Sequence, residues 1–307
     1  MKVLSNEYKD RLSHWMRALS DDFYLPLGKI SFEAACTEEE LRPEEAMKLS
    51  FIPVEQGYTW GNQWEYCWFR GMITLPKEAE GKRIALDLQP GGESTIFING
   101  KEFGTYRSSW VEVPHHYIED NFITTCGHEG ETYNILMETY AGHDYPDSWS
   151  WATGPVLPGK YEPRKENHDR SVLGNATFGI WNEEAYQLFM DADTLQKLLA
   201  VQDDTSLRAS AIAEALENFT LTADPEQPLE DRIVSYTAAR KKLAPVLAAV
   251  NGSTVPEFYA IGNAHLDLAW LWPMAETYRK TARTFAAQLR LIEAYPGYRF
   301  LQSQPAS

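Results

Sequence analysis

The pattern of hydrophobic residues differs between successive stretches of the chain. Residues 51–179 are dense in Gly, Pro, aromatic and β-branched residues, and they break into short runs bounded by turn signals. This pattern predicts an antiparallel β-sandwich of jelly-roll-like type, because such strands can bury one face against a second sheet. The runs that read as strands are residues 66–75, 83–88, 94–98, 101–103 and 132–140. Asn99-Gly100, between the third and fourth of these runs, predicts a hairpin turn.

Helical periodicity dominates on both sides of this region. In residues 6–20 the apolar side chains share one side of a predicted N-terminal helix: Tyr8, Leu12, Trp15 and Leu19. After Trp181 glycines become rare, and two apolar stripes follow: Ile212, Leu216 and Phe219, then Leu229, Ile233, Tyr236, Leu243, Leu247 and Val250. We expect several amphipathic helices in residues 181–250, two of them joined as a hairpin, with these stripes packed in a core.

The last fifty residues show a third pattern. A mostly apolar run, residues 257–264, precedes a helical stretch that Pro296-Gly297 ends, and residues 298–302 read as a second strand. Strand, helix and strand predict a βαβ unit with parallel strands, which opens an α/β domain. The apolar residues of this helix share one face: Tyr278, Ala282, Phe285, Leu289 and Ile292. Its charged residues share another, on which we expect solvent-exposed ion pairs: Glu276, Arg279, Lys280 and Arg283.

These patterns divide the chain into four segments. They are an N-terminal helical segment (1–30), a β-sandwich domain (31–180), a helical linker region (181–250) and the opening of the α/β domain (255–307).

Composition, charge and cysteine content narrow the protein class. The 307 residues are 44% hydrophobic and 23% charged, as in an ordered globular protein, and the formal net charge of -16 is expected to repel nucleic acid and anionic lipid. No run approaches the roughly 20 apolar residues of a membrane helix, and the start lacks a secretory leader, so we expect a cytoplasmic protein with no membrane contact. Cys36, Cys67 and Cys126 suit neither a disulfide framework nor a CxxC metal site, and we expect free thiols.

Candidate chemistry lies directly after the run 257–264. His265 and Asp267 are two residues apart at the carboxyl end of a predicted strand, so both side chains point to one side. An imidazole nitrogen and a carboxylate oxygen are two of the four groups that zinc requires. The alternative is that His265 caps the next helix and Asp267 is solvated in a loop. Trp270 and Trp272 either line the rim of a sugar pocket or are buried beneath the helix.

The motifs of this segment resemble those of the glycoside hydrolase family 38 α-mannosidases. The matching strings are AIGNAHLDLAWLWP at 260–273, ETYRK at 276–280, RTF at 283–285 and FLQSQP at 300–305. The family's usual forms are GHxHxDxAWLWP, ETxRK, RTF and a terminal SQ. The β-rich and helical regions are similar to the N-terminal part of the cytosolic-type members. Asn263 stands where many members have His, so we expect it to tune the site without binding metal.

The resemblance implies a zinc-dependent retaining α-mannosidase that acts on mannose-containing oligosaccharides. It implies that His265 and Asp267 bind the zinc and that Trp270 lies under the mannose ring. It places the other two ligands, the nucleophile and the acid/base beyond Ser307, so that this chain carries no catalytic residue and ends within the first βαβ of an α/β barrel catalytic domain. We therefore expect this fragment to be inactive and to bind zinc weakly or not at all. A homo-oligomer stays open.

Two other functions remain as alternatives. The tryptophans of the sandwich could stack on sugars in a non-catalytic carbohydrate-binding module: Trp60, Trp64, Trp68, Trp110, Trp149 and Trp151. Another metal hydrolase, such as a polysaccharide deacetylase-like enzyme, also uses an HxD strand, although the AWLWP and ETYRK strings speak against it.

Overall fold

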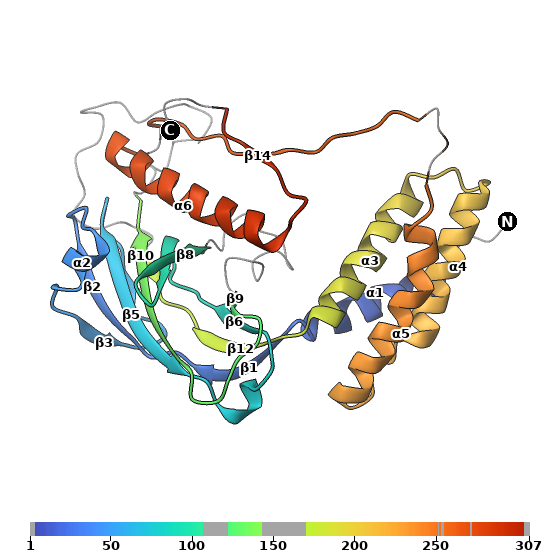
Figure 1. Cartoon of the computed structure of the whole chain (residues 1–307), viewed down its shortest axis with the longest axis horizontal. Helices are drawn as coiled ribbons and strands as arrows, with labels where there is room; N and C mark the ends of the chain where they lie inside the picture. Colours follow the sequence, from blue (N-terminus) through green and yellow to red (C-terminus); the bar gives the residue numbers. More distant parts are fainter. Residues whose placement is uncertain are drawn as a thin grey trace. The chain divides into compact units, whose positions relative to one another are not determined.

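A computed structural model describes residues 4–106, 122–142, 170–250, 252, 255–270 and 272–303 (Figure 1). The chain divides into two compact units. The first combines Met1–Leu25 with Trp181–Phe258, and the second combines Pro26–Ile180 with Tyr259–Ser307. Within the described residues no helix is both long and apolar enough to cross a membrane.

The first unit is a helical bundle, as the apolar stripes predict. Its helices are α1 (Asn6–Asp21), α3 (Glu183–Ala200), α4 (Leu207–Thr222) and α5 (Leu229–Leu247). Ser5, Asn182 and Ser206 cap the first three of these with side-chain oxygens that accept backbone N–H groups. Core side chains that are at most 1% exposed include Leu12, Leu19, Phe23, Leu188, Leu195, Ile212, Leu216, Phe219, Tyr236 and Leu243.

Helix α1 packs in this bundle, although the sequence pattern assigns it to a separate segment. Arg11 Nη2 donates to Thr220 O (2.7 Å) and Trp15 Nε1 donates to Ala223 O (2.7 Å). These bonds cap the carboxyl end of α4, whose last carbonyls have no helical partners. Val250 lies beyond the end of α5 and is exposed, so the predicted stripe extends too far.

The second unit contains the β-sandwich, as predicted. One sheet has the order β3-β2-β5-β10-β7-β8 and the other β1-β12-β6-β9. The strands of the larger sheet are β2 (Phe32–Thr37), β3 (Ile52–Val54), β5 (Tyr66–Thr74), β7 (Glu93–Ile98), β8 (Lys101–Tyr106) and β10 (Thr132–Tyr140). Those of the smaller sheet are β1 (Tyr24–Lys29), β6 (Ile84–Asp87), β9 (Phe122–Thr124) and β12 (Thr177–Trp181). A two-stranded sheet pairs β4 (Thr59–Trp60) with β11 (Ser171–Val172).

The sandwich core and its hairpin follow from the residue pattern. Alternate side chains of both sheets meet in one cluster that includes Phe69, Leu86 and Met137. Asn99 and Gly100 join β7 to β8 with φ values of 52° and 77°, which is the conformation that makes Asn-Gly favourable in a two-residue turn.

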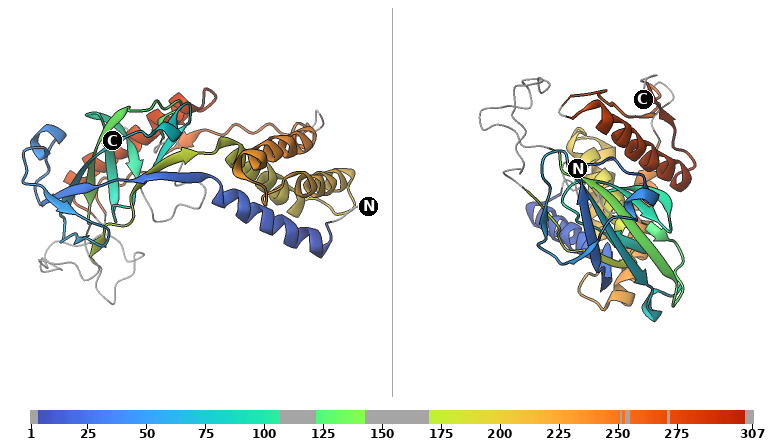
Figure 2. Two further views of the ribbon diagram at one scale, coloured as in Figure 1. Left: turned by 90° about the horizontal axis from the view of Figure 1, so that it is seen from below. Right: turned by 90° about the vertical axis from the view of Figure 1, so that its left-hand side faces the viewer.

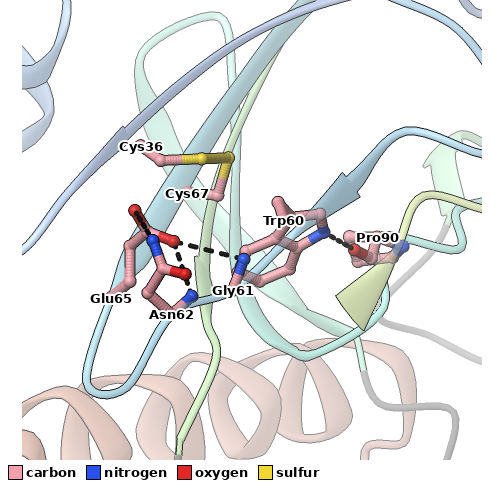
Figure 3. The surroundings of a disulfide bond; sticks show 7 residues. All are labelled: Cys36, Trp60, Gly61, Asn62, Glu65, Cys67 and Pro90. Atoms are coloured by element: carbon pink, nitrogen blue, oxygen red, sulfur yellow. Dashed lines mark hydrogen bonds between the residues drawn. A yellow bond between two sulfur atoms is a disulfide. The ribbon is translucent and has the colours of Figure 1, made fainter. Parts of the chain in front are cut away.

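The expectation of three free thiols is wrong. Cys36 of β2 and Cys67 of β5 are direct partners in the antiparallel register, with a Cα–Cα distance of 4.0 Å, and a disulfide joins them (Figure 3). Cys126 is free and exposed. The two paired cysteines are 31 residues apart in the chain, so their pairing depends on a strand register that spacing alone does not reveal.

Strands β5 and β10 are buried on both faces near one end. Tyr66, Trp68 and Glu138 lie on the face that points away from the sandwich core, yet each is at most 3% exposed. Two elements cover this outer face: the segment around α2 (Pro43–Ala46), which packs Leu41, Leu49 and Phe51 on Trp68, and helix α6 (Met274–Ala294) (Figure 1).

The βαβ unit is present, but its strands are short. Its helix, α6, turns its charged face toward the sheet instead of the predicted apolar face. β13 (Gly262–Asn263) pairs in parallel with β14 (Phe300–Leu301), as predicted. The expectation that the charged face of α6 is solvent-exposed is wrong, because Glu276 and Arg283 are buried against the sheet. Tyr278, Leu289 and Ile292, on the predicted apolar face, are instead exposed.

Candidate metal centre

His265 and Asp267 follow β13 in a loop, and their side chains meet. His265 Nε2 lies 3.2 Å from Asp267 Oδ1, while Leu266 between them points inward and is buried. The nitrogen and oxygen thus converge from an accessible loop, as the two-residue spacing predicts, and this donor pair suits zinc. In the part of the chain that the structure describes, no third His, Cys, Asp or Glu joins them to complete a metal-binding group.

Asn263 has a structural contact. Its side-chain amide donates from Nδ2 to Leu301 O at 2.7 Å, which ties the end of β13 to β14. This bond occupies the amide nitrogen and fixes the strand from which the loop of His265 departs.

Trp270 and Trp272 lie next to each other in this loop. Their ring centroids are 6.1 Å apart in an edge-to-face arrangement, and the Trp270 backbone N–H donates to Trp272 O at 3.3 Å. Both indoles are partly exposed, so they are not fully buried beneath the helix, and their partial exposure alone does not place them at the rim of a pocket. Their contact with sugar stays a prediction.

Thr277, in the first turn of α6, anchors the loop. Its hydroxyl donates to Leu268 O and accepts a hydrogen bond from Trp272 Nε1 at 3.1 Å. One buried side chain therefore holds both the stretch after Asp267 and the second tryptophan.

Four charged residues of α6 meet two carboxylates of the sheet in what we call the α6 cluster: Glu276, Arg279, Lys280 and Arg283 with Glu93 of β7 and Glu138 of β10. Glu276 pairs with Arg283, Lys280 Nζ lies 2.6 Å from Glu93 Oε2, and Arg279 Nη1 lies 2.6 Å from Glu138 Oε1. Tyr66 of β5 donates from its hydroxyl to Glu276 Oε2 at 2.7 Å. Charged residues thereby join α6 to three neighbouring strands.

Burial shapes the proton affinities within the α6 cluster. Removal from water raises the pKa of Glu138 to about 7, although the guanidinium groups of Arg279 and Arg283 favour its charged form. Burial and the neighbouring Glu276 carboxylate raise the pKa of the Tyr66 hydroxyl, which therefore stays protonated and serves as a donor. Burial disfavours the charge on Arg283, but Glu276 and Glu93 outweigh it and raise the pKa of that side chain.

Sequence reasoning overlooked Glu93, Glu138 and Tyr66 as partners of α6. One signal was available for Glu138, which is the only charged residue of β10. Among the sandwich tryptophans, Trp60 and Trp68 are fully buried and cannot stack on a sugar, whereas Trp64 is partly exposed. Trp110, Trp149 and Trp151 lie outside the described residues.

Two family descriptions match the chain. Residues 256–307 match the glycosyl hydrolases family 38 N-terminal domain, and residues 27–168 match the jelly roll domain of α-mannosidase. Both matched segments are similar to parts of the α-mannosidases of glycoside hydrolase family 38. The first match contains the loop of His265 and helix α6, and the second covers most of the sandwich.

Several proteins similar to this chain are α-mannosidases. Alpha-mannosidase 2C1 of Homo sapiens is 25% identical over 322 residues, which cover 95% of this chain and 28% of that protein. Alpha-mannosidase G of Dictyostelium discoideum is 24% identical over 87% of this chain and 23% of its own length. Alpha-mannosidase of Saccharomyces cerevisiae (strain ATCC 204508 / S288c) is 52% identical over 46 residues, 15% of this chain and 4% of that protein. The chain thus spans little more than a quarter of the first relative.

Among solved structures, β-glucuronidase from Ruminococcus gnavus aligns with 52% of this chain and 29% of that chain. The sequence identity is 16% and the TM-score is 0.33.

Proposed function

We propose that the whole protein is a zinc-dependent retaining α-mannosidase that removes terminal α-linked mannose from oligosaccharides or glycans. The observation that carries this proposal is the convergence of His265 Nε2 and Asp267 Oδ1 at the end of β13, inside the segment that matches family 38. The match with α-mannosidases favours this activity over that of a deacetylase-like metal hydrolase. It also leaves less reason to treat the sandwich as an independent sugar-binding module.

In this proposal His265 and Asp267 hold the zinc and Trp270 lies under the sugar ring. Bound zinc supplies a positive charge that orients sugar hydroxyls and stabilises charge in the transition state. The contribution of the described residues is geometric. Thr277 holds the backbone at Leu268, and Asn263 holds the strand that precedes His265.

Hydrolysis with retention also needs two carboxylic acids about 5 to 5.5 Å apart on either side of the glycosidic bond. We place the nucleophile, the acid/base and the remaining two zinc ligands outside residues 1–307. The 307-residue chain alone is then inactive, because two ligands and one stacking residue supply neither covalent nor acid catalysis.

The test uses the whole protein and its His265→Ala and Asp267→Asn variants. We expect each variant to lose zinc on dialysis and to lose most turnover of an aryl α-mannoside, while the matched variant His14→Ala, in the helical unit, keeps both. Retention of stoichiometric zinc by the His265→Ala variant would exclude this residue as a ligand.

Location and partners follow as further parts of the proposal. We place the protein in the cytoplasm, without nucleic-acid or membrane partners, and leave a homo-oligomer open. The Cys36–Cys67 disulfide weighs against this location, because the cytoplasm keeps most thiols reduced. Alkylation of thiols at the moment of cell lysis, followed by mass spectrometry, measures whether this pair is oxidised in the cell.

A further inference from the structure

Lys280 lies where helix α6, the sandwich and the loop of His265 meet. Its ammonium group is 2.6 Å from Glu93 Oε2 and 4.4 Å from the centroid of the Trp272 ring. Its side chain is 14% exposed. A single cation thus contacts a carboxylate of β7 and an indole of the loop at once.

Two hydrogen bonds join Trp272 to the loop and to Thr277, and a third runs from Thr277 back to the loop. The carbonyl of Trp272 accepts the backbone N–H of Trp270, its indole N–H donates to Thr277, and the Thr277 hydroxyl in turn donates to Leu268 O. A displacement of the Trp272 ring therefore alters the backbone between Asp267 and Trp270.

The chemistry of the contact explains why a cation is needed there. The electron-rich face of an indole attracts an ammonium group, and more strongly where water is partly excluded. The Glu93 carboxylate pairs with the same ammonium group at 2.6 Å, so the cation has a carboxylate and an aromatic partner at once. A neutral side chain of equal length would fill the space but would hold neither partner.

We propose that Lys280 is a positioning residue. By contacting both Glu93 of the sandwich and Trp272, it holds the loop of His265 and Asp267 in a fixed position on the sandwich. The inference rests on the proposed function, in which the loop of His265 and Asp267 binds zinc. The jelly roll then acts as a platform for the metal site, and Glu93 is the residue of that platform on which Lys280 depends.

The test compares Lys280→Met, Lys280→Arg and Glu93→Gln in the 307-residue chain, with Lys197→Met as the control. Lys197 lies on the exposed surface of α3 and pairs with a neighbour one turn away, Asp193. Amide hydrogen exchange is followed at Trp270, in the loop, and at Met137, in the sandwich core. We expect Lys280→Met and Glu93→Gln to accelerate exchange at Trp270 at least tenfold and at Met137 less than threefold. Lys280→Arg should stay within threefold of the unmodified chain, because a guanidinium group can pair with Glu93 and stack on Trp272.

Unchanged exchange at Trp270 in Lys280→Met, or equal acceleration at Met137, would overturn the proposal and leave Lys280 with a stabilising role alone. If Lys280→Met does not fold, Glu93→Gln decides by the same two criteria. In the whole protein, Lys280→Met should weaken zinc binding about tenfold, as loss of an outer contact does in other metal sites. If His265→Ala keeps its zinc, the proposed function fails, whereas unchanged exchange at Trp270 rejects the positioning role independently.

Discussion

Glu276 and Arg283, two turns apart on α6, form an ion pair whose side chains are almost completely buried against the outer face of the larger sheet. Tyr66 donates to the same glutamate, and Glu93 lies 3.6 Å from the same arginine. Two charges removed from water in this way need each other, since either one alone would be left uncompensated in a poorly solvated place. The pair therefore fixes how α6 lies on the sandwich.

Removal of one partner of this pair should destabilise the second unit strongly. We expect Arg283→Met to lower the free energy of unfolding by about 3 to 5 kcal/mol, because Glu276 then stays buried without its cation. The double variant Glu276→Gln/Arg283→Met should recover part of that loss. Urea denaturation measures both, and Lys197→Met, at an exposed ion pair, should change stability by less than about 0.5 kcal/mol. A loss below about 1 kcal/mol in Arg283→Met would show that water reaches the pair.

Glu138 should make the stability of this unit depend on pH. Its pKa is about 7 in the fold against an ordinary value of 4.5, so the folded chain holds a proton that the unfolded chain releases between these pH values. Stability therefore falls as pH rises from 4.5 to 7, by about 3 kcal/mol for this group. Glu138→Gln should lack this component, so the stability difference between the two chains changes across that range. A constant difference from pH 4.5 to 7.5 would mean that Arg279 keeps Glu138 ionised throughout.

The strands, the hairpin turn and the βαβ unit could be predicted because each depends on neighbouring residues. The apolar and β-branched run 94–98 identifies β7, Asn99-Gly100 specifies its turn, and the spacing of His265 and Asp267 brings their side chains together. All of these relationships lie within a few residues of one another, where backbone geometry alone sets the outcome.

The orientation of α6 could not be predicted in the same way. Charged residues at helical spacing indicate a solvated face unless their partners are known, and Glu93 and Glu138 precede the helix by well over a hundred residues. The same reason hid the disulfide, since Cys36 and Cys67 become neighbours only through the register of β2 and β5. In both cases long-range packing, which no local pattern encodes, decided the result.

The disulfide should be measurable by thiol counting and by stability. Unreduced chain should show one reactive thiol, that of Cys126, and three after reduction in denaturant. Reduction should lower the free energy of unfolding by about 2 to 4 kcal/mol, because the open chain gains conformational freedom when the cross-link is lost. Cys126→Ser serves as a control and should leave the stability unchanged. Three reactive thiols in the native, unreduced chain would contradict the pairing.

Zinc content shows how many of the zinc ligands the 307-residue chain supplies compared with the whole protein. Among the described residues of the 307-residue chain no third His, Cys, Asp or Glu joins His265 and Asp267, and two ligands leave half of a tetrahedral shell to water. We expect the dialysed chain to hold less than about 0.1 equivalent of zinc and the whole protein about one, since a closed set of four ligands binds far more tightly. Elemental analysis of both, with His265→Ala for each, makes the comparison. If the short chain retained one equivalent and lost it on His265→Ala, the missing ligands would have to lie within residues 1–307, and the proposed division of the metal site would be wrong.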